Sequence, residues 1–309
     1  MATPIPPVTP IPPPAVPRPT GKTPSRRGGV AHRVGWWRHV VALLCVVFAL
    51  VPIVFVVSAA FNPRGTLGST TLWPSGAGLE NFRKLFTTTD YGRWFGNSLL
   101  VSAAAGALSM FASACGAYAF SRFRFRGRRA GMTGLLLVQM FPQFLAVVAI
   151  YLMFTWITAR YPGIGFNTSW ALILLYLGGA LGANTWLMKG FFDTVPTSLD
   201  ESARVDGASH SQVFFTIMLP LVSPVLAVTG LLSFIGTMNE FLLANIFLTD
   251  PESKTLAVGL YGMIQEGNRD ANFGLFCAGS LLMAIPIVAL FLYLQRFIVS
   301  GLTSGAVKG

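Results

Sequence analysis

The sequence has few of the residues on which most enzymes and metal proteins depend. Only 11% of its 309 residues are charged, and it contains three histidines and three cysteines. His32, His39 and His210 are scattered along the chain, and we find no nucleophile beside a base, no pair of catalytic carboxylates and no metal-ligand spacing. The sequence therefore predicts no catalytic site and no metal site, and we expect the chain not to be an enzyme.

The cysteines and the Gly-Lys-Thr motif at residues 21–23 also indicate no catalytic or nucleotide-binding role. Cys45, Cys115 and Cys277 fall within long apolar segments, where a free thiol behaves as a small hydrophobic group. Residues 21–23, Gly-Lys-Thr, resemble the end of a phosphate-binding loop, but Val16 stands where its first glycine is needed and no strand precedes it. We therefore expect neither disulfides nor a cofactor bound by this chain.

The first 35 residues are rich in proline and contain no acidic residue. Since proline lacks the N–H that a helix needs, residues 1–35 are expected to form a disordered or polyproline-II cytoplasmic tail. No apolar stretch precedes a cleavage site there, so the first membrane span is expected to serve as an uncleaved insertion signal. Residues 36–309 are expected to form one membrane domain.

Long apolar stretches dominate that domain. The chain is 53% hydrophobic with a mean hydropathy of +0.62. A helix needs roughly 20 apolar residues to cross about 30 Å of hydrocarbon. The predicted fold class is therefore all-α, a polytopic membrane protein with six transmembrane helices. The predicted spans are residues 40–61, 97–121, 131–155, 169–189, 221–249 and 273–299.

Basic residues are unevenly distributed over the predicted connections. They concentrate in the tail, in residues 122–129, and after the fourth and sixth spans. The positive-inside rule therefore predicts that both termini are cytoplasmic. The net charge is +11, and the basic residues that produce it flank the predicted spans. This placement favours contact with anionic membrane lipid and argues against nucleic acid as a partner.

Residues 200–220 are a patterned polar stretch between two apolar segments. Asp200 and Glu201 stand near the start of a predicted helix, where carboxylates suit the positive end of the helix dipole. A glycine costs about 1 kcal/mol in a helix relative to alanine, so Gly207 is expected to divide the stretch into two short helices. Pro220 suits the first turn of the following span.

The order of these residues resembles the EAA loop of ABC importer permeases, with Ser202 in place of the usual alanine. The resemblance implies a cytoplasmic coupling helix, at about residues 190–220, that docks on a separate ATPase. ATP and Mg would then be bound by that partner. The docking residues implied are Asp200, Glu201, Ser202, Ala203, Asp206, Gly207, Ala208, Ile217, Leu219 and Pro220.

The external connection after the first span resembles the carbohydrate-uptake permeases of this family. The similar stretches are residues 72–75 (Leu-Trp-Pro-Ser), 79–82 (Leu-Glu-Asn-Phe) and 94–98 (Trp-Phe-Gly-Asn-Ser). An interfacial amphipathic helix anchored by Trp94 and Phe95 explains the last stretch equally well.

Asn239 and Glu240 lie in the fifth predicted span, where sugar permeases of this family commonly have Asn-Glu-Phe. Glu240 is the only acidic residue within the predicted spans, and an ionisable group in a membrane is a functional hypothesis by default. We expect both residues to line the translocation pathway or a subunit interface. A solvated position near the outer end of the span is the alternative.

The last loop and the C-terminus resemble MalG-type permease subunits of maltose/maltodextrin importers. Residues 251–272 are thereby implied to contact an extracytoplasmic sugar-binding protein, through Leu256, Gly259 and Tyr261. Residues 301–309 are implied to contact the ATPase, through Thr303, Gly305 and Lys308.

The resemblance as a whole implies a permease subunit of an ATP-driven importer in the cytoplasmic (inner) membrane of a prokaryote. Its partners would be a second permease, expected to be a different chain, an ATPase dimer and a sugar-binding protein. The substrate would be a maltose/maltodextrin-like or other oligosaccharide.

Two alternatives remain open at this point. The first is an ABC permease for a polyol or glycerol phosphate, although a phosphate would need Arg or Lys in spans that hold essentially none away from their ends. The second is an ion-coupled secondary transporter. Such transporters usually carry internal repeats and charged residues near the membrane midplane, and here Glu240 stands alone without an evident repeat.

Overall fold

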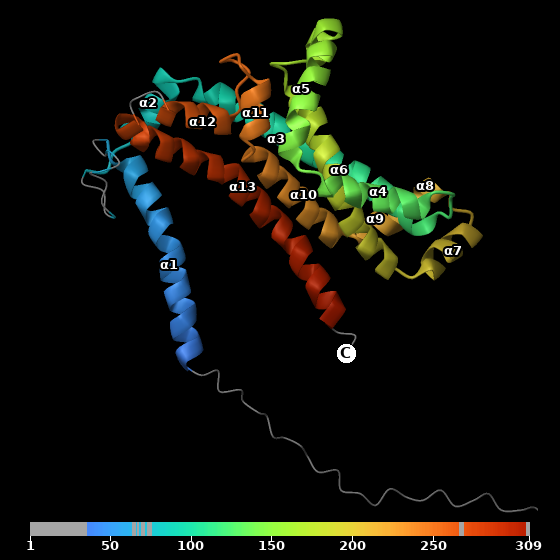
Figure 1. Cartoon of the computed structure of the whole chain (residues 1–309). Coiled ribbons are helices and arrows are strands. Elements are labelled where there is room, and N and C mark those ends of the chain that lie inside the picture. The colour runs from blue at the N-terminus through green and yellow to red at the C-terminus, as the bar shows by residue number, and fades with distance from the viewer. Residues whose placement is uncertain are drawn as a thin grey trace, which may run out of the picture. The chain divides into compact units, whose positions relative to one another are not determined.

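The computed structural model describes residues 36–306, apart from residues 64, 65, 67, 69–71, 73–75 and 266–268, and gives only the backbone of residues 143–144 and 299–306. Every regular element in this part of the chain is a helix (Figure 1). The all-α prediction is therefore confirmed. The proline-rich tail and residues 73–75 of the first external connection lie outside the described residues.

The elements comprise α-helices, one 3₁₀ turn (η1) and one π-helical turn (η2). In chain order they are α1 (Trp36–Phe61), α2 (Glu80–Thr88), α3 (Tyr91–Arg122), α4 (Arg128–Met140), α5 (Gln143–Arg160), η1 (Pro162–Ile164), α6 (Ser169–Thr194), α7 (Thr197–Val205), α8 (His210–Gln212), η2 (Val213–Met218), α9 (Leu219–Leu221), α10 (Ser223–Met238), α11 (Leu242–Phe247), α12 (Leu256–Gln265) and α13 (Arg269–Ala306).

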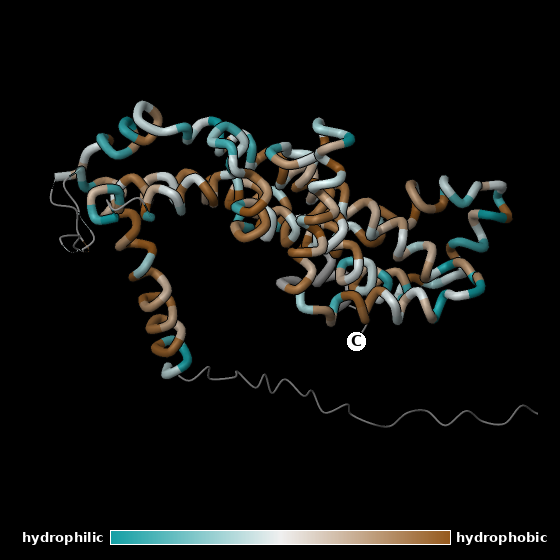
Figure 2. Tube along the Cα trace, turned by 45° about the horizontal axis from the view of Figure 1, so that its top comes forward, coloured by the Kyte–Doolittle hydropathy of each residue, from teal (hydrophilic) through white to brown (hydrophobic). Residues whose placement is uncertain are grey.

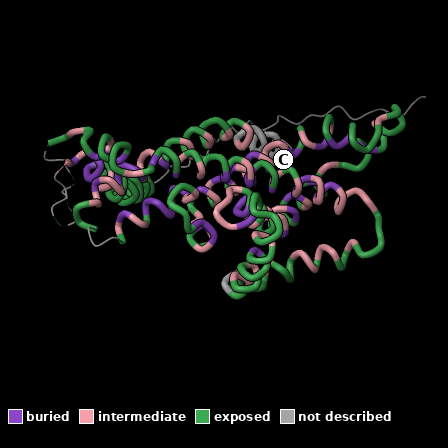
Figure 3. The backbone as a smooth tube through the Cα atoms, turned by 90° about the horizontal axis from the view of Figure 1, so that it is seen from above, coloured by how far each residue is buried: buried purple, intermediate pink, exposed green. Residues whose placement is uncertain are grey.

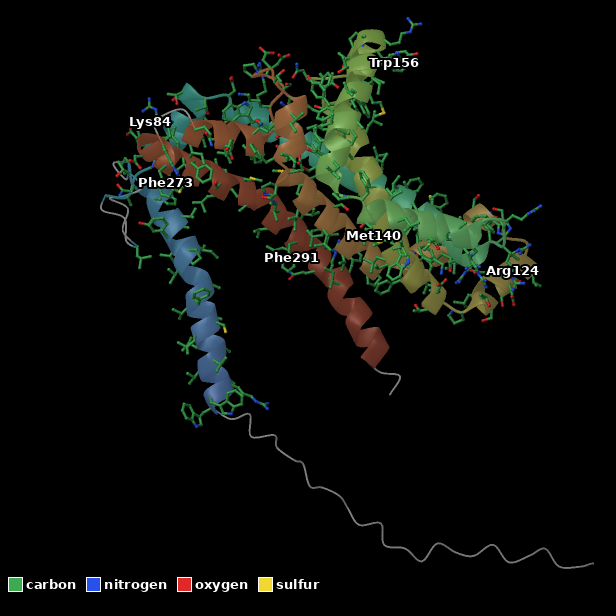
Figure 4. The ribbon with its side chains drawn as sticks, viewed as in Figure 1. Lys84, Arg124, Met140, Trp156, Phe273 and Phe291 are labelled. Carbon is green, nitrogen blue, oxygen red and sulfur yellow. The ribbon has the colours of Figure 1, made fainter. Side chains whose placement is uncertain are left out.

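Helix α2 fastens the end of the first span. The amide of Asn81 donates to the carbonyl oxygens of Ala60 and Asn62, both at 3.0 Å. These are carbonyl groups that the end of a helix leaves without a helical partner. The rings of Phe82 and Phe61 pack with their centroids 5.1 Å apart. The Asn-Phe pair noted in the sequence thus has a structural role, while Lys84 of the same helix points outward (Figure 4).

Helices α3, α6 and α10 pack against one another at the centre of residues 48–309. Glycines allow the close approach. A Cβ atom at Gly106 would lie 3.5 Å from the backbone nitrogen of Phe234, and one at Gly116 would lie 3.2 Å from Cγ2 of Thr185. Such small residues are typical of helix contacts in membranes, where close van der Waals packing holds helices together.

Two of the predicted spans are broken into bent helices in the structure. Residues 131–155 fall in α4 and α5, which are bent by 101° at Phe141 and Pro142. A residue before proline avoids the helical conformation, and Phe141 is extended with ψ 129°. Residues 221–249 fall mainly in α10 and α11, separated at residues 239–241, and α10 is bent by 79° from the helix that precedes it.

The long helices leave much apolar surface unburied. Helices α1, α3, α6 and α13 are long and apolar enough to span a membrane, and the described residues give six candidate spans if each bent pair counts as one. Only 39% of the most apolar stretch of α3, 33% of that of α6 and 22% of that of α13 is buried. Apolar residues continue along the helices, and hydrophilic ones occur mainly near their ends and connections (Figure 2). Exposed residues are widespread along the chain (Figure 3). This exposed apolar surface is typical of helices that contact the hydrocarbon of a lipid bilayer.

Candidate functional site

The polar stretch at residues 197–221 forms two helical pieces, as the sequence predicts. Helix α7 ends at Val205, and Gly207 follows with φ +90°. Glycine adopts this left-handed conformation without the steric cost that a Cβ atom brings. The chain then starts α8 with a capping box, in which the hydroxyl of Ser209 accepts from the backbone of Gln212 and the side chain of Gln212 accepts from the backbone of Ser209.

An ion pair anchors α7 to the end of α3. Arg122 Nε contacts Asp200 Oδ2, and the two side chains are only 8% and 13% exposed. Arg122 also donates through Nη2 to the carbonyl oxygen of Val195 at 2.8 Å. Asp200 therefore holds the loop in place and presents almost no surface to a partner, which changes the role that the resemblance gave it. Arg122 was read in the sequence only as a topology signal.

A second polar contact joins α3 and α6 nearby. The hydroxyl of Ser121 donates to Asp193 Oδ1 at 2.6 Å, and Asp193 is also paired with Lys189 one turn earlier in α6. The loop, the end of α3 and the end of α6 are thus linked by charges and hydrogen bonds.

The inner face of the loop packs on an apolar cluster beneath it. Val213, Phe214 and Met218 are buried there, and Ala203 and Ala208 pack against the same group. The cluster is completed by side chains of α3, α6 and α10 and by Val222 just before α10: Ala114, Ala117, Tyr118, Met188, Phe192, Val222 and Val225. The small residues of the motif therefore seat the loop on the helix ends, a role that their size permits.

The outer face of the loop remains exposed. Glu201, Ser202, Asp206 and Gly207 lie on it, together with Pro220 beyond the π-helical turn. Val205 is 87% exposed, the highest value among the large hydrophobic residues. Sequence reasoning missed Val205, although an apolar residue between Arg204 and Asp206 in a polar helix was a visible signal. Ile217 and Leu219 are half-buried, and Leu219 packs against the apolar cluster.

A cavity of about 870 Å³ lies among α3, α4, α5, α6, α10 and α11, and Ala105 and Ser109 are its lining residues from α3. Its wall is mostly apolar, with a few polar groups from Gln139, Tyr176, Ser233, Thr237 and Glu240. No Lys or Arg is among the described residues that line it. Such a mixture of apolar walls and a few oriented polar groups is typical of small-molecule sites.

Glu240 lies on this wall at the break between α10 and α11. Its Oε2 accepts from the hydroxyl of Tyr176 at 2.6 Å and from the backbone of Ala244 at 3.0 Å, and its Oε1 accepts from the backbone of Leu243 at 2.8 Å. The carboxylate thus caps the start of α11, where N–H groups lack helical partners. Asn239, by contrast, donates to Ile235 of its own helix and is exposed away from the cavity lining.

The loop between α11 and α12 is held against the start of α3 by hydrogen bonds. Asn97 donates to the carbonyl oxygens of Glu252 and Lys254, both at 3.0 Å, and the hydroxyl of Ser98 accepts from the backbone of Leu256 at 2.7 Å. These contacts give the Trp-Phe-Gly-Asn-Ser stretch a defined task. It positions the loop, and Trp94 itself is only 9% exposed, with its Nε1 donating to the carbonyl oxygen of Pro251 at 3.3 Å. Trp94 is therefore buried within the chain, which corrects the alternative that it anchors an interfacial helix.

The three residues expected to contact a binding protein are not equally accessible. Leu256 is fully buried, and Gly259 lies so close to the Trp94 ring that a Cβ atom would overlap it. Tyr261 is 40% exposed and packs on Phe241 with ring centroids 4.3 Å apart. Leu256 and Gly259 therefore support the loop from inside, and Tyr261 alone of the three presents a side chain outward.

The C-terminal residues expected to contact an ATPase lie at the end of α13 and beyond it. Thr303 and Gly305 belong to the backbone of α13, whereas Lys308 lies outside the described residues. Their contact stays a prediction.

These features define a polytopic helical membrane protein with an exposed, polar-faced loop at one end and a cavity among its helices. Residues 109–304 match the family described as binding-protein-dependent transport system inner membrane component, and the chain belongs to this family.

Curated relatives extend the match over most of the chain. The galactooligosaccharides transport system permease protein GanQ of Bacillus subtilis (strain 168) is 42% identical over 258 residues, covering 82% of this chain and 89% of the relative. The maltodextrin transport system permease protein MdxG of the same organism is 41% identical, covering 75% and 81%. The maltose/maltodextrin transport system permease protein MalG of Vibrio vulnificus (strain YJ016) is 42% identical, covering 70% and 72%.

Solved structures share the fold. A chain from the crystal structure of a bacterial ABC transporter involved in the import of the acidic polysaccharide alginate superposes with a TM-score of 0.70 at 21% identity, covering 84% of this chain and 96% of that one. A second structure, of the alginate transporter with a pentasaccharide-bound periplasmic protein, gives a TM-score of 0.63 at 17% identity. At this low sequence identity the similarity shows only that the fold is shared.

Proposed function

We propose that this chain is a permease subunit of an ATP-driven importer that moves an oligosaccharide across the cytoplasmic membrane. The observation that carries the proposal is the loop at residues 197–221, fixed on its inner face to α3, α6 and α10 and exposed on its outer face. Relatives named for galactooligosaccharide, maltodextrin and maltose transport, at nearly equal identity, support an oligosaccharide without favouring one of them.

In this proposal the loop transmits the movement of a partner ATPase. A dimer of that ATPase binds ATP and Mg, and its closure displaces the loop. Because the Arg122–Asp200 pair ties α7 to α3, and the chain continues from the loop into α10, the displacement reaches the helices around the cavity. Glu240 lies where α10 meets α11, so the cavity wall would respond to the same movement.

The cavity suits a neutral, hydroxyl-rich substrate. Its described lining has no cation, and the acid Glu240 is already engaged by three donors. A phosphate group would find no positive charge there, which counts against a glycerol phosphate, whereas a polyol would fit the same groups. Ion-coupled transport is disfavoured because the carboxylate serves to cap a helix.

The remaining partners and the orientation belong to the proposal as well. Both termini and the loop would be cytoplasmic, because basic residues concentrate on that side. A second, different permease would complete the pathway, and an extracytoplasmic sugar-binding protein would deliver substrate near Tyr261.

The first test is affinity purification of the tagged chain from its native membrane. The proposal expects a second permease and an ATPase to copurify, and expects proteoliposomes holding the complex to accumulate a labelled maltooligosaccharide or galactooligosaccharide only with ATP and binding protein. A chain that purifies alone and moves solute without ATP would replace the proposal by a secondary transporter. Uptake of a polyol in place of all oligosaccharides would keep the importer and change the substrate class.

A further inference from the structure

A groove of about 920 Å³ runs between α4 and α6, on the side of the loop and apart from the cavity. The first part of α4 and the last part of α6 form its walls, and the two helices contact each other directly. The lining residues are Arg128, Arg129, Met132, Thr133, Leu136, Trp186, Leu187, Lys189, Gly190, Phe191, Asp193 and Thr194.

The charged end of this groove is positive. Arg128 and Arg129 start α4, and Lys189 faces them from α6. The single acid of the groove, Asp193, is already held by Lys189 and by the Ser121 hydroxyl. Within the described residues no carboxylate forms an ion pair with Arg128 or Arg129. Arg128 donates through Nη2 to the carbonyl oxygen of Ser121 at 3.4 Å. Its remaining N–H groups and the guanidinium of Arg129 are therefore available to an anion.

The other end of the groove is apolar. Leu136, Trp186 and Leu187 line it, and each is more than one third exposed. At a rise of about 1.5 Å per residue, Leu136 lies about 12 Å along α4 from Arg128. The groove thus has cations at the end near the loop and an apolar wall at the end farther from the loop. Figure 4 shows Arg124 at the end where α7 and α8 lie and Met140 farther along α4.

We propose that this groove binds an anionic phospholipid of the cytoplasmic leaflet, with its phosphate on Arg128 and Arg129 and an acyl chain along Leu136 and Trp186. Basic pockets between membrane helices on the cytoplasmic side bind anionic headgroups, and the charge and apolar order here match one such lipid. The assignment of sides rests on the proposed orientation. A free nucleotide or phosphate would use the cations and leave the apolar wall without a purpose.

The test is native mass spectrometry of the purified, assembled complex with phosphatidylglycerol or phosphatidylcholine added at equal concentration. The double variant Arg128→Gln with Arg129→Gln is compared with the charge-matched control Arg124→Gln with Arg126→Gln in the same connection. Each cation near a membrane surface contributes about fivefold to anionic lipid binding, so the groove variant is expected to lose about 20- to 30-fold in phosphatidylglycerol affinity. Equal losses in both variants would overturn the groove and leave a diffuse charge effect.

A second variant tests the groove without changing charge. Gly190 lines the groove and a Cβ atom there meets no atom within 4 Å, so Gly190→Phe can begin a bulky side chain in the groove. Gly134→Phe, where a Cβ atom also meets nothing within 4 Å, is the matched control on α4 outside the groove. Lipid retention is expected to fall in the Gly190 variant and to persist in the control. Retention in both would refute the site.

Two further outcomes are informative. Competition by millimolar inorganic phosphate as effective as that by phosphatidylglycerol would identify a phosphate site in place of a lipid site. A groove that binds lipid in the isolated chain but not in the complex would show that a partner subunit covers it, which also overturns the proposal. ATP-driven sugar uptake, measured in parallel, fails independently of lipid binding if the proposed function is wrong.

Discussion

Arg122 at the end of α3 and Asp200 in the first turn of α7 form an ion pair that is almost completely shielded from solvent, with 8% and 13% of the side chains exposed. Because Arg122 also donates to Val195 in the connection between α6 and α7, one guanidinium joins three parts of the chain. Movement of α7 is therefore coupled to α3 through the contacts of Arg122.

Removing one partner of this pair is expected to release the loop. Arg122→Gln would leave the Asp200 carboxylate buried without its cation, a change that typically costs about 3–5 kcal/mol. We expect faster amide hydrogen exchange at residues 195–209 and loss of ATP-driven uptake. Adding Asp200→Asn to Arg122→Gln should restore much of the protection, since it removes the unpaired charge. Unchanged exchange in the single variant would contradict the anchoring role.

The exposed Val205 is expected to be a contact for the ATPase. Val205→Asp should leave the fold intact, because the side chain is 87% exposed, and should weaken ATPase association by about tenfold or more, as expected for a central apolar contact. Copurification of the ATPase measures this. Phe86→Asp, which changes an exposed apolar residue of α2, is the control and should retain the ATPase. Retention by both variants would remove Val205 from the docking surface.

Glu240 is expected to act as a hydrogen-bond acceptor rather than as a charge. Gln can still accept from the backbone of α11 and donate to Tyr176, so Glu240→Gln should keep uptake within about threefold of the native rate. Glu240→Ala loses the cap, which is typically worth about 1 kcal/mol, and should reduce uptake further. Uptake of a labelled oligosaccharide into proteoliposomes compares the two. If both variants were equally inactive, the negative charge itself would be required.

Gly259 and Gly262 offer a matched pair on α12. A Cβ atom at Gly259 would overlap the Trp94 ring, whereas one at Gly262 meets nothing within 4 Å. Gly259→Ala is therefore expected to destabilise the complex by about 1–3 kcal/mol through overpacking, and Gly262→Ala to leave it unchanged or slightly more stable. Thermal unfolding in detergent measures both. Equal melting temperatures for the two variants would show that α12 yields easily at Trp94.

The features that depend on neighbouring residues could be predicted from the sequence. Six apolar stretches indicated the spans because the thickness of a bilayer sets the length that a helix needs. The break at Gly207 followed from the cost of glycine in a helix, and the structure confirms it with φ +90°. The pattern around Glu201 and Pro220 led to the family that the comparison then showed.

Properties that depend on which distant residues meet were decided only by the tertiary structure. Nothing near Arg122 in the sequence indicates that Asp200 is its partner, and Leu256 looks like any loop residue until Ser98 and α3 bury it. Pro142 was a local signal of the break at Phe141. The break before Leu242 left the hydropathy unchanged, since a chain remains apolar whether or not it bends. Sequence therefore determined the class of protein and the place of the loop, whereas packing determined which of its residues anchor it and which stay exposed.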